Sequence, residues 1–175
     1  ILMEVTATIV EQATELSRAI RALARIDLTF GKAQYALDLN GIVPEMIDRP
    51  SNDSLRLVNA RHPLLPNAAV PISLENGGAN PILVITGPNT GGKTVALKTT
   101  GLLALMNQAG LHIPAEQGTR LPIFKNIVAD IGDEQSIEQS LSTFSAHMTT
   151  IVDILRDTDR NCLVLLDELG SGTDP

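Results

Sequence analysis

Eight residues near the middle of the chain, GPNTGGKT at 87–94, have the residue types and spacing of a phosphate-binding loop. Gly87 and Gly92 are its fixed glycines, which let the backbone turn tightly so that N–H groups converge on phosphate oxygens. Lys93 is expected to reach the β- and γ-phosphates, and Thr94 to ligate Mg²⁺, a hard cation that prefers oxygen ligands. The loop therefore predicts binding of ATP or ADP with Mg²⁺, and its remaining members should also line the nucleotide: Pro88, Asn89, Thr90 and Gly91.

A second motif, LVLLDE at 163–168, is an apolar run that ends in two adjacent carboxylates. Asp167 is expected to hold Mg²⁺ through water. Glu168 should lie on the other side of the strand end, where it could orient and deprotonate an attacking water. Two acids at a strand end could also form a solvated edge, but the phosphate-binding loop upstream favours the catalytic interpretation.

The elements around these motifs predict an α/β fold. The run ILVIT at 82–86 is continuously apolar and predicts a strand buried on both faces, directly before the loop. Residues 94–108 are good helix formers and Gly110 could end that helix. Residues 143–156 form a second expected helix with Phe144 and Met148 in its core-facing stripe, and 162–166 a further buried strand.

The amino-terminal part differs in character. Apolar residues that step by three and four predict a long amphipathic helix over 1–29, and a second helical stretch should end at Asn40-Gly41. IVPEMIDRPSND then resembles a linker. We therefore expect a helical arm over 1–50 and a nucleotide-binding domain over 51–175, with a strand at 55–58 and a looping segment from there to 82.

Composition limits the alternatives. The chain has 175 residues, of which 43% are hydrophobic, and a net charge of −7, which argues against a bulk phosphate-backbone binder. Its only cysteine, Cys162, cannot form an internal disulfide, so a reducing cytoplasm is expected. No apolar run is long enough to span a membrane, and no Cys/His cluster suggests zinc. Ile1 and Pro175 suggest a piece of a longer protein.

Four segments together, GPNTGGKT, DELGSGTDP, RHPLL and SLSTFSAHM, resemble the MutS family, relatives of the ABC-type ATPases. The resemblance covers about residues 55–175, and Thr90, STFSAHM and GSGTDP look like its bacterial MutS-two branch. It implies a P-loop NTPase sheet flanked by helices, of which 51–175 would be the first half, with the helical arm leading into it. Relatives' DNA clamp and carboxyl-terminal Smr nuclease domain would lie outside this segment.

The same resemblance implies roles for individual residues. Ser142 would be the signature serine, which acts in trans on a nucleotide held by the partner subunit of a homodimer. Serine is also a good helix N-cap, so capping the helix that follows is the alternative role for Ser142. Asn89 resembles an extra γ-phosphate contact. Val70 and Ile72 fall where relatives contact adenine, and His62 could be a polar contact there or a structural histidine in a turn before Pro63.

The function implied is ATP hydrolysis that couples the nucleotide state of a dimer to binding of branched or mismatched DNA, which would suppress homologous recombination, or to rescue of collided ribosomes. Any nuclease activity would belong to another domain. One alternative is an ABC-type ATPase of another family or a kinase, but a transporter subunit would show LSGGQ where this chain has SLSTFSAH. The other is a nucleotide-dependent dimerisation module that never hydrolyses ATP.

Overall fold

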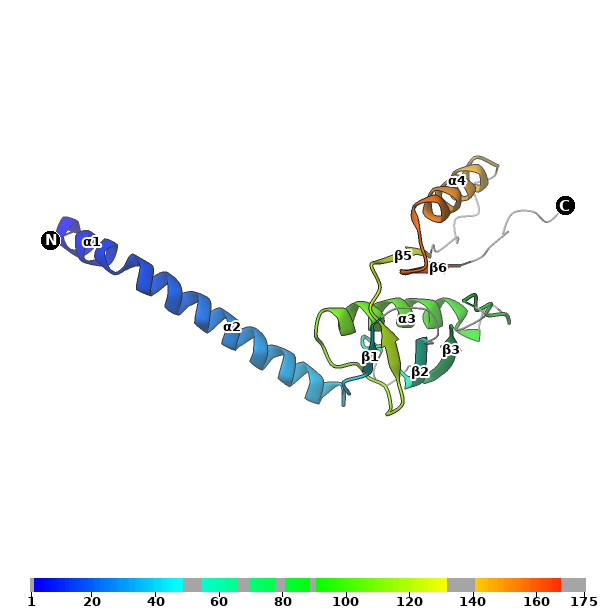
Figure 1. Cartoon of the computed structure of the whole chain (residues 1–175), viewed down its shortest axis with the longest axis horizontal. Helices are drawn as coiled ribbons and strands as arrows, with labels where there is room; N and C mark the ends of the chain where they lie inside the picture. Colours follow the sequence, from blue (N-terminus) through cyan, green and yellow to red (C-terminus); the bar gives the residue numbers. More distant parts are fainter. Residues whose placement is uncertain are drawn as a thin grey trace.

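The structure is a computed structural model that describes residues 2–48, 55–65, 70–77, 81–88, 91–131 and 141–167, without the side chains of Thr8 and of 141–147. It is a mixed α/β protein with an extended helical arm (Figure 1). Its elements, in chain order, are α1 (Leu2–Glu11), α2 (Ala13–Asp38), β1 (Glu45–Ile47), β2 (Leu55–Ala60), β3 (Ile72–Asn76), α3 (Lys93–Gln108), β4 (Arg120–Pro122), β5 (Asn126–Asp130), α4 (Leu141–Asp157) and β6 (Cys162–Leu166).

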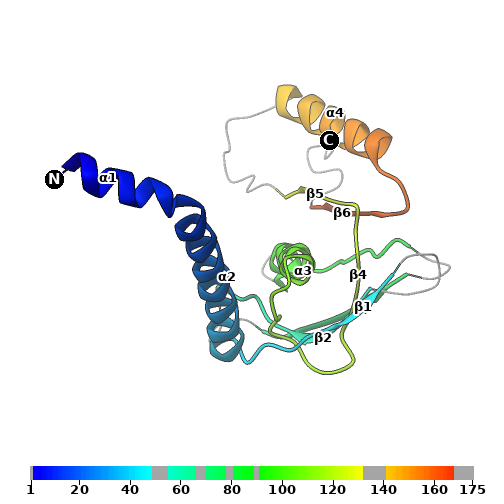
Figure 2. The same ribbon diagram turned by 60° about the vertical axis from the view of Figure 1, so that its left-hand side comes forward.

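The body is layered around α3. A four-stranded sheet in the order β1-β4-β2-β3 lies on one side of this helix, and the parallel pair β5-β6 lies on the other, with α4 beyond it (Figure 2). The main core fills the space between the four-stranded sheet and α3, and its fully buried side chains include Leu57, Leu103, Ile113 and Leu121. These aliphatic side chains take the place of the aromatic ones that the chain largely lacks.

The helix ends follow sequence signals. At the end of α2, Asn40 has a φ of 49°, its N–H donates to Leu37 O (3.1 Å), and the N–H of Gly41 donates to Ala36 O (2.8 Å). Gly110, with a φ of 71°, ends α3 in the same way. A left-handed residue after the helix lets the next N–H groups satisfy its last carbonyls. The expected helix stop at Asn40-Gly41 and the expected stop at Gly110 are confirmed.

The arm differs from expectation in one respect. The predicted division near residue 29 is wrong, because α2 continues unbroken from Ala13 to Asp38 and the irregularity is instead at Gln12. Gly31 lies near the expected break. A glycine in a helix interior costs only about 1 kcal/mol relative to alanine, which is too little to interrupt a helix of this length. Most of the arm's large apolar residues, such as Ile20 and Leu23, are exposed.

Three predictions about strands are wrong. Residues 82–86 form no strand in the described structure, and Ile82 and Val84 are 79% and 75% exposed, because β5 and β6 pair with each other and not with this run. β1 lies within the expected linker, where it pairs with β4, and β3 lies within the expected looping segment, where it pairs with β2. Apolar runs predict burial, but strands of three to five residues depend on their partners.

The carboxyl-terminal elements largely follow the predictions. α3, α4 and β6 form where helices and a strand were expected, and β2 extends the expected strand to Ala60 through a bulge at Asn59. The core role expected for Met148 is wrong, because it is 38% exposed, whereas Ile151 on the same helix is 4% exposed. Phe144 has no described side chain. Among the described residues, no helix is both long and apolar enough to cross a membrane.

α3 approaches β6 closely at Gly101. A Cβ added there would lie 2.6 Å from Leu165 Cδ1, and Leu165 is only 6% exposed. A Cβ at residue 101 would force the largely buried side chain of Leu165 to shift. Gly31 in α2 is the opposite case, because nothing lies within 4 Å of an added Cβ.

We therefore expect opposite effects of the same substitution at the two glycines. Gly31→Ala should raise the free energy of unfolding by up to about 1 kcal/mol through helix propensity. Gly101→Ala should lower the free energy of unfolding, because overpacking against Leu165 costs about 1–3 kcal/mol. This cost outweighs the gain in helix propensity that alanine brings. Urea denaturation of both variants measures the difference, and equal stabilisation by the two would contradict the close packing of α3 on β6.

Candidate nucleotide-binding site

The glycine-rich loop enters α3 in the geometry that its glycines allow. Gly87 has a φ of 149° and Gly92 a φ of 76°, both unfavourable for residues with a side chain. The N–H of Gly91 donates to Pro88 O (2.9 Å), so these two residues of the loop lie close together. Gly92 is the N-cap of α3, so the first helical N–H groups lie directly after the loop. A helix N-terminus of this kind offers donors and a positive partial charge to an anion.

Lys93 is the first residue of α3, and its side chain turns back over the loop. Its Nζ donates to Gly87 O at 2.6 Å. The ammonium group therefore lies above the loop's backbone, on the side where the helix begins. This position suits a lysine that reaches a phosphate group held by the loop.

Thr94 and Asp167 are in direct contact although they are far apart in the sequence. The hydroxyl of Thr94 donates to Asp167 Oδ2 at 2.6 Å, and Asp167 is 7% exposed. Thr94 lies about two helical turns before Gly101 on the same face of α3. Asp167 follows Leu165 on the same face of β6. The close approach at Gly101 and Leu165 therefore also brings the hydroxyl to the carboxylate.

The strand pair fixes Asp167 from the other side. β5 and β6 are parallel and in register from Asn126↔Cys162 to Asp130↔Leu166, so their carboxyl ends lie at one edge. The N–H of Asp167 continues the ladder by donating to Asp130 O (3.0 Å). The backbone of Asp167 is therefore held as firmly as the strand itself.

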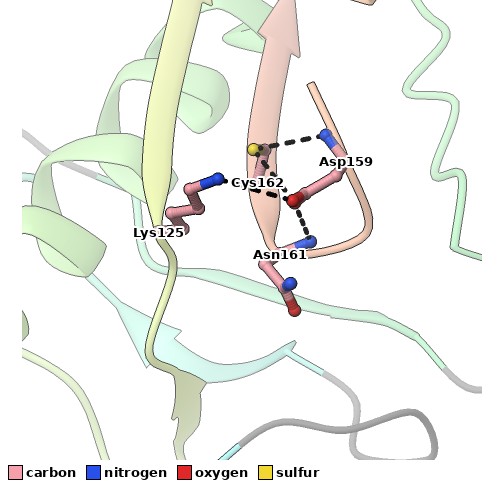
Figure 3. A network of polar contacts seen from close by, with 4 residues as sticks. All are labelled: Lys125, Asp159, Asn161 and Cys162. Atoms are coloured by element: carbon pink, nitrogen blue, oxygen red, sulfur yellow. Dashed lines mark hydrogen bonds and ion pairs between the residues drawn. The ribbon is translucent and has the colours of Figure 1, made fainter. Parts of the chain in front are cut away.

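A polar turn before β6 anchors the opposite end of the pair (Figure 3). The N–H of Asn161 donates to Asp159 Oδ1 (2.7 Å), and this bond holds the pKa of Asp159 below its ordinary value of 3.8. Smaller contributions come from the half-buried Cys162 thiol, which donates to the same oxygen at 3.5 Å, and from Lys125 Nζ, 3.7 Å from Oδ2. The N–H of Lys125 also donates to Asn161 O (2.8 Å), which ties the turn to the start of β5.

The donor set at this edge fits a magnesium ion. A threonine hydroxyl and a carboxylate are hard oxygen ligands, and Mg²⁺ commonly takes only one or two protein groups beside waters and phosphates. The 2.6 Å contact between Thr94 and Asp167 shows that the two groups share one small region. No cluster of three or more His, Cys, Asp or Glu side chains able to hold a metal occurs in the described part of the chain.

The other predicted site residues lie either outside the described part of the chain or elsewhere in it. Asn89, Thr90 and Glu168 lie outside the described residues. Ser142 lies within α4, which begins at Leu141, so its predicted N-cap position is wrong for the described helix. Val70 is 80% exposed, whereas Ile72 belongs to β3 and packs partly against the core. His62 accepts a hydrogen bond from the N–H of Leu64 (3.3 Å) within a turn.

Two features of the site were not anticipated from the sequence. The sequence suggested neither Gly101 as the point of close packing nor Asp130 as the acceptor for Asp167. A glycine in the middle of a helix that otherwise contains good helix formers was the available signal for the first. Asp130 gave no separate signal, because β5 itself was not predicted.

Removing the Thr94 hydroxyl should destabilise the protein. Thr94→Val takes one donor from a buried carboxylate, which costs about 1–3 kcal/mol. Thr99→Val is the matched control, since Thr99 is 1% exposed but its hydroxyl donates to Val95 O of its own helix (2.6 Å). Urea unfolding should show a larger loss for Thr94→Val than for Thr99→Val, and Thr94→Ser should retain most of the stability. Equal losses in the two valine variants would show that the contact with Asp167 is unimportant.

Comparison with known proteins identifies the family. The family model for MutS domain V matches residues 83–175, which include the loop, α3, α4 and β6. Proteins named endonuclease MutS2 are similar over the whole chain, with 56% identity in a Geobacillus species (strain WCH70) and 54% in Alkaliphilus metalliredigens. The chain spans 22% of the length of each of these relatives. The match to MutS domain V over more than half of the chain, and the identity to MutS2 proteins along its entire length, show that it belongs to the MutS family and matches a segment of MutS2.

Proposed function

We propose that this segment is the ATP-binding and hydrolysing part of a MutS2-like protein, with the ABC-type P-loop arrangement around α3. The observation that carries the proposal is the hydrogen bond from Thr94 to Asp167 (2.6 Å), which joins the end of the glycine loop to the end of β6. In P-loop ATPases these are the two groups that share one magnesium ion. Membership of the MutS family, through its domain V, supports a nucleotide-using role.

The chain's own residues would divide the work as follows. The loop's N–H groups and the start of α3 bind the phosphates, and Lys93 neutralises charge on the β- and γ-phosphates. Thr94 and Asp167 would hold Mg²⁺, which supplies further charge neutralisation during phosphoryl transfer. Glu168, the residue after Asp167, would orient a water and accept its proton.

The larger role is coupling within a homodimer. We infer that nucleotide state changes the dimer interface and the helical arm, and thereby the binding of branched or mismatched DNA or of collided ribosomes by regions outside this segment. The net charge of −7 supports placing any nucleic-acid contact elsewhere. The relatives' name, endonuclease MutS2, is consistent with a DNA target.

Three variants of the full-length protein test the enzymatic assignment. Glu168→Gln should retain nucleotide binding but lower the hydrolysis rate about 10²–10⁴-fold, because the general base is lost. Lys93→Ala should abolish binding, since it removes the charge over the loop. Glu11→Gln is the matched control, because Glu11 is exposed on α1. ATP turnover and nucleotide titration measure both effects. Equal turnover by Glu168→Gln and the wild type would contradict the role of Glu168, and a wild type that binds ATP without turnover would be a non-hydrolysing dimerisation module.

The proposed action of Ser142 on the partner's nucleotide has its own test. Ser142→Ala should bind nucleotide but turn it over slowly, and Lys93→Ala should not bind it. If Ser142 acts across the dimer, mixing the two inactive proteins restores one complete site in each mixed dimer, giving about a quarter of the wild-type rate. No recovery, in a mixture shown to contain mixed dimers, would place Ser142 with its own subunit's nucleotide.

A further inference from the structure

The end of the arm is joined to the segment that follows α3. The backbones of Ile42 and Ile113 form an antiparallel bridge, with Ile42 N donating to Ile113 O (2.9 Å) and Ile113 N to Ile42 O (3.0 Å). A Cβ added at Gly41 would lie 2.9 Å from His112 Cβ, so the two segments are as close as backbones allow. Tyr35 and Leu39 in the last turns of α2 pack against the core beside them.

A second attachment lies further back along the arm. Lys32 Nζ donates to Ala109 O at 2.5 Å, and Ala109 is the C-cap of α3. A cation at a helix C-terminus is favoured by the partial negative charge of the exposed carbonyls. The ammonium group lies next to Gly110, where a Cβ, if one were added, would be 3.4 Å from Lys32 Nζ.

The contacts at the end of α2 and the bond from Lys32 to Ala109 together fix the direction of α2, which neither fixes alone. The contacts at Gly41 and Ile42, with Tyr35 and Leu39 packed beside them, hold the last turns of α2, and the rest of the helix could swing about them. Lys32 lies six residues before the last residue of α2, Asp38, which is about 9 Å along the helix axis, so its bond to Ala109 fixes the angle of swing. The rest of the arm projects away from the body, and the full length of α2 is about 39 Å for its 26 residues (Figure 1).

The other end of α3 carries the nucleotide site. Lys93 and Thr94 are its first two residues, and Ala109 follows its last residue, Gln108. An α-helix moves as a stiff element, so a shift of the loop end also displaces the carbonyl that Lys32 holds.

We propose that Lys32 is the positioning residue that locks the α2 arm to α3, so that movement of α3 between nucleotide states changes the direction of the arm. This rests on the proposed nucleotide site, and it adds the residue through which that site would act on the arm. Without the Lys32 contact, a movement of α3 no longer sets the direction of the arm.

Energy transfer between the arm and the body tests this directly. Fluorophores are placed through unnatural amino acids at the exposed positions Arg21 in α2 and Gln117 in the body of the full-length protein. Transfer efficiency is compared with MgADP and with a non-hydrolysable MgATP analogue. The wild type should show a shift between the two nucleotides, and Lys32→Met should lose it and broaden the distribution, while Lys32→Arg should retain it.

Arg25→Met is the matched control, because it removes the same charge from an exposed position of the same helix. It should behave as the wild type. All variants should bind MgADP with unchanged affinity, since none touches the loop, and this also shows that they are folded. The proposal is overturned if the transfer efficiency of Lys32→Met changes between the two nucleotides as much as that of Arg25→Met. It is also overturned if the wild type binds both nucleotides without any change in transfer efficiency. Failure of the wild type to bind nucleotide at all would instead refute the proposed function.

Discussion

The close packing of α3 against β6 is the constraint on which the candidate site depends. Gly101 has no side chain to separate the helix from Leu165, and an added Cβ would lie only 2.6 Å from that side chain. The same two faces carry Thr94 and Asp167, which meet at 2.6 Å between oxygens. The site is therefore a consequence of helix and strand periodicity, because one close contact fixes the position of the next along both elements.

α3 is also the element through which the rest of the chain is connected. The glycine loop precedes its first turn, the main core packs on its buried residues, and the arm attaches at its end through Lys32 and the Ile42–Ile113 bridge. Packed interiors deform little, so the helix can move only as a unit relative to its neighbouring layers. This arrangement explains how a phosphate-binding loop and an arm, at opposite ends of one helix, could respond to each other.

Local signals in the sequence predicted the parts of the structure that local chemistry determines. The two fixed glycines of the loop do adopt positive φ, α3 begins at Lys93, one residue before its expected start, and β6 occupies the expected five residues. The strand expected at 82–86 failed for a non-local reason, because an apolar run does not specify its partner. The short strands β1 and β4 were missed because β1 depends on pairing with β4, and β4 on pairing with β1 and β2. Asp167 could be predicted as a site residue, but its contact with Thr94 required the packing that Gly101 permits.

A structure of the full-length protein with MgADP bound tests the central claim most directly. The claim is that Thr94 and Asp167, which are in direct contact here, together form a magnesium site. We predict that Thr94 Oγ1 leaves Asp167 Oδ2 and coordinates Mg²⁺, with Asp167 holding a water of the same ion and Lys93 Nζ moving from Gly87 O to a phosphate. Nucleotide bound with the hydrogen bond between Thr94 and Asp167 intact, and the metal held by other residues, would contradict it.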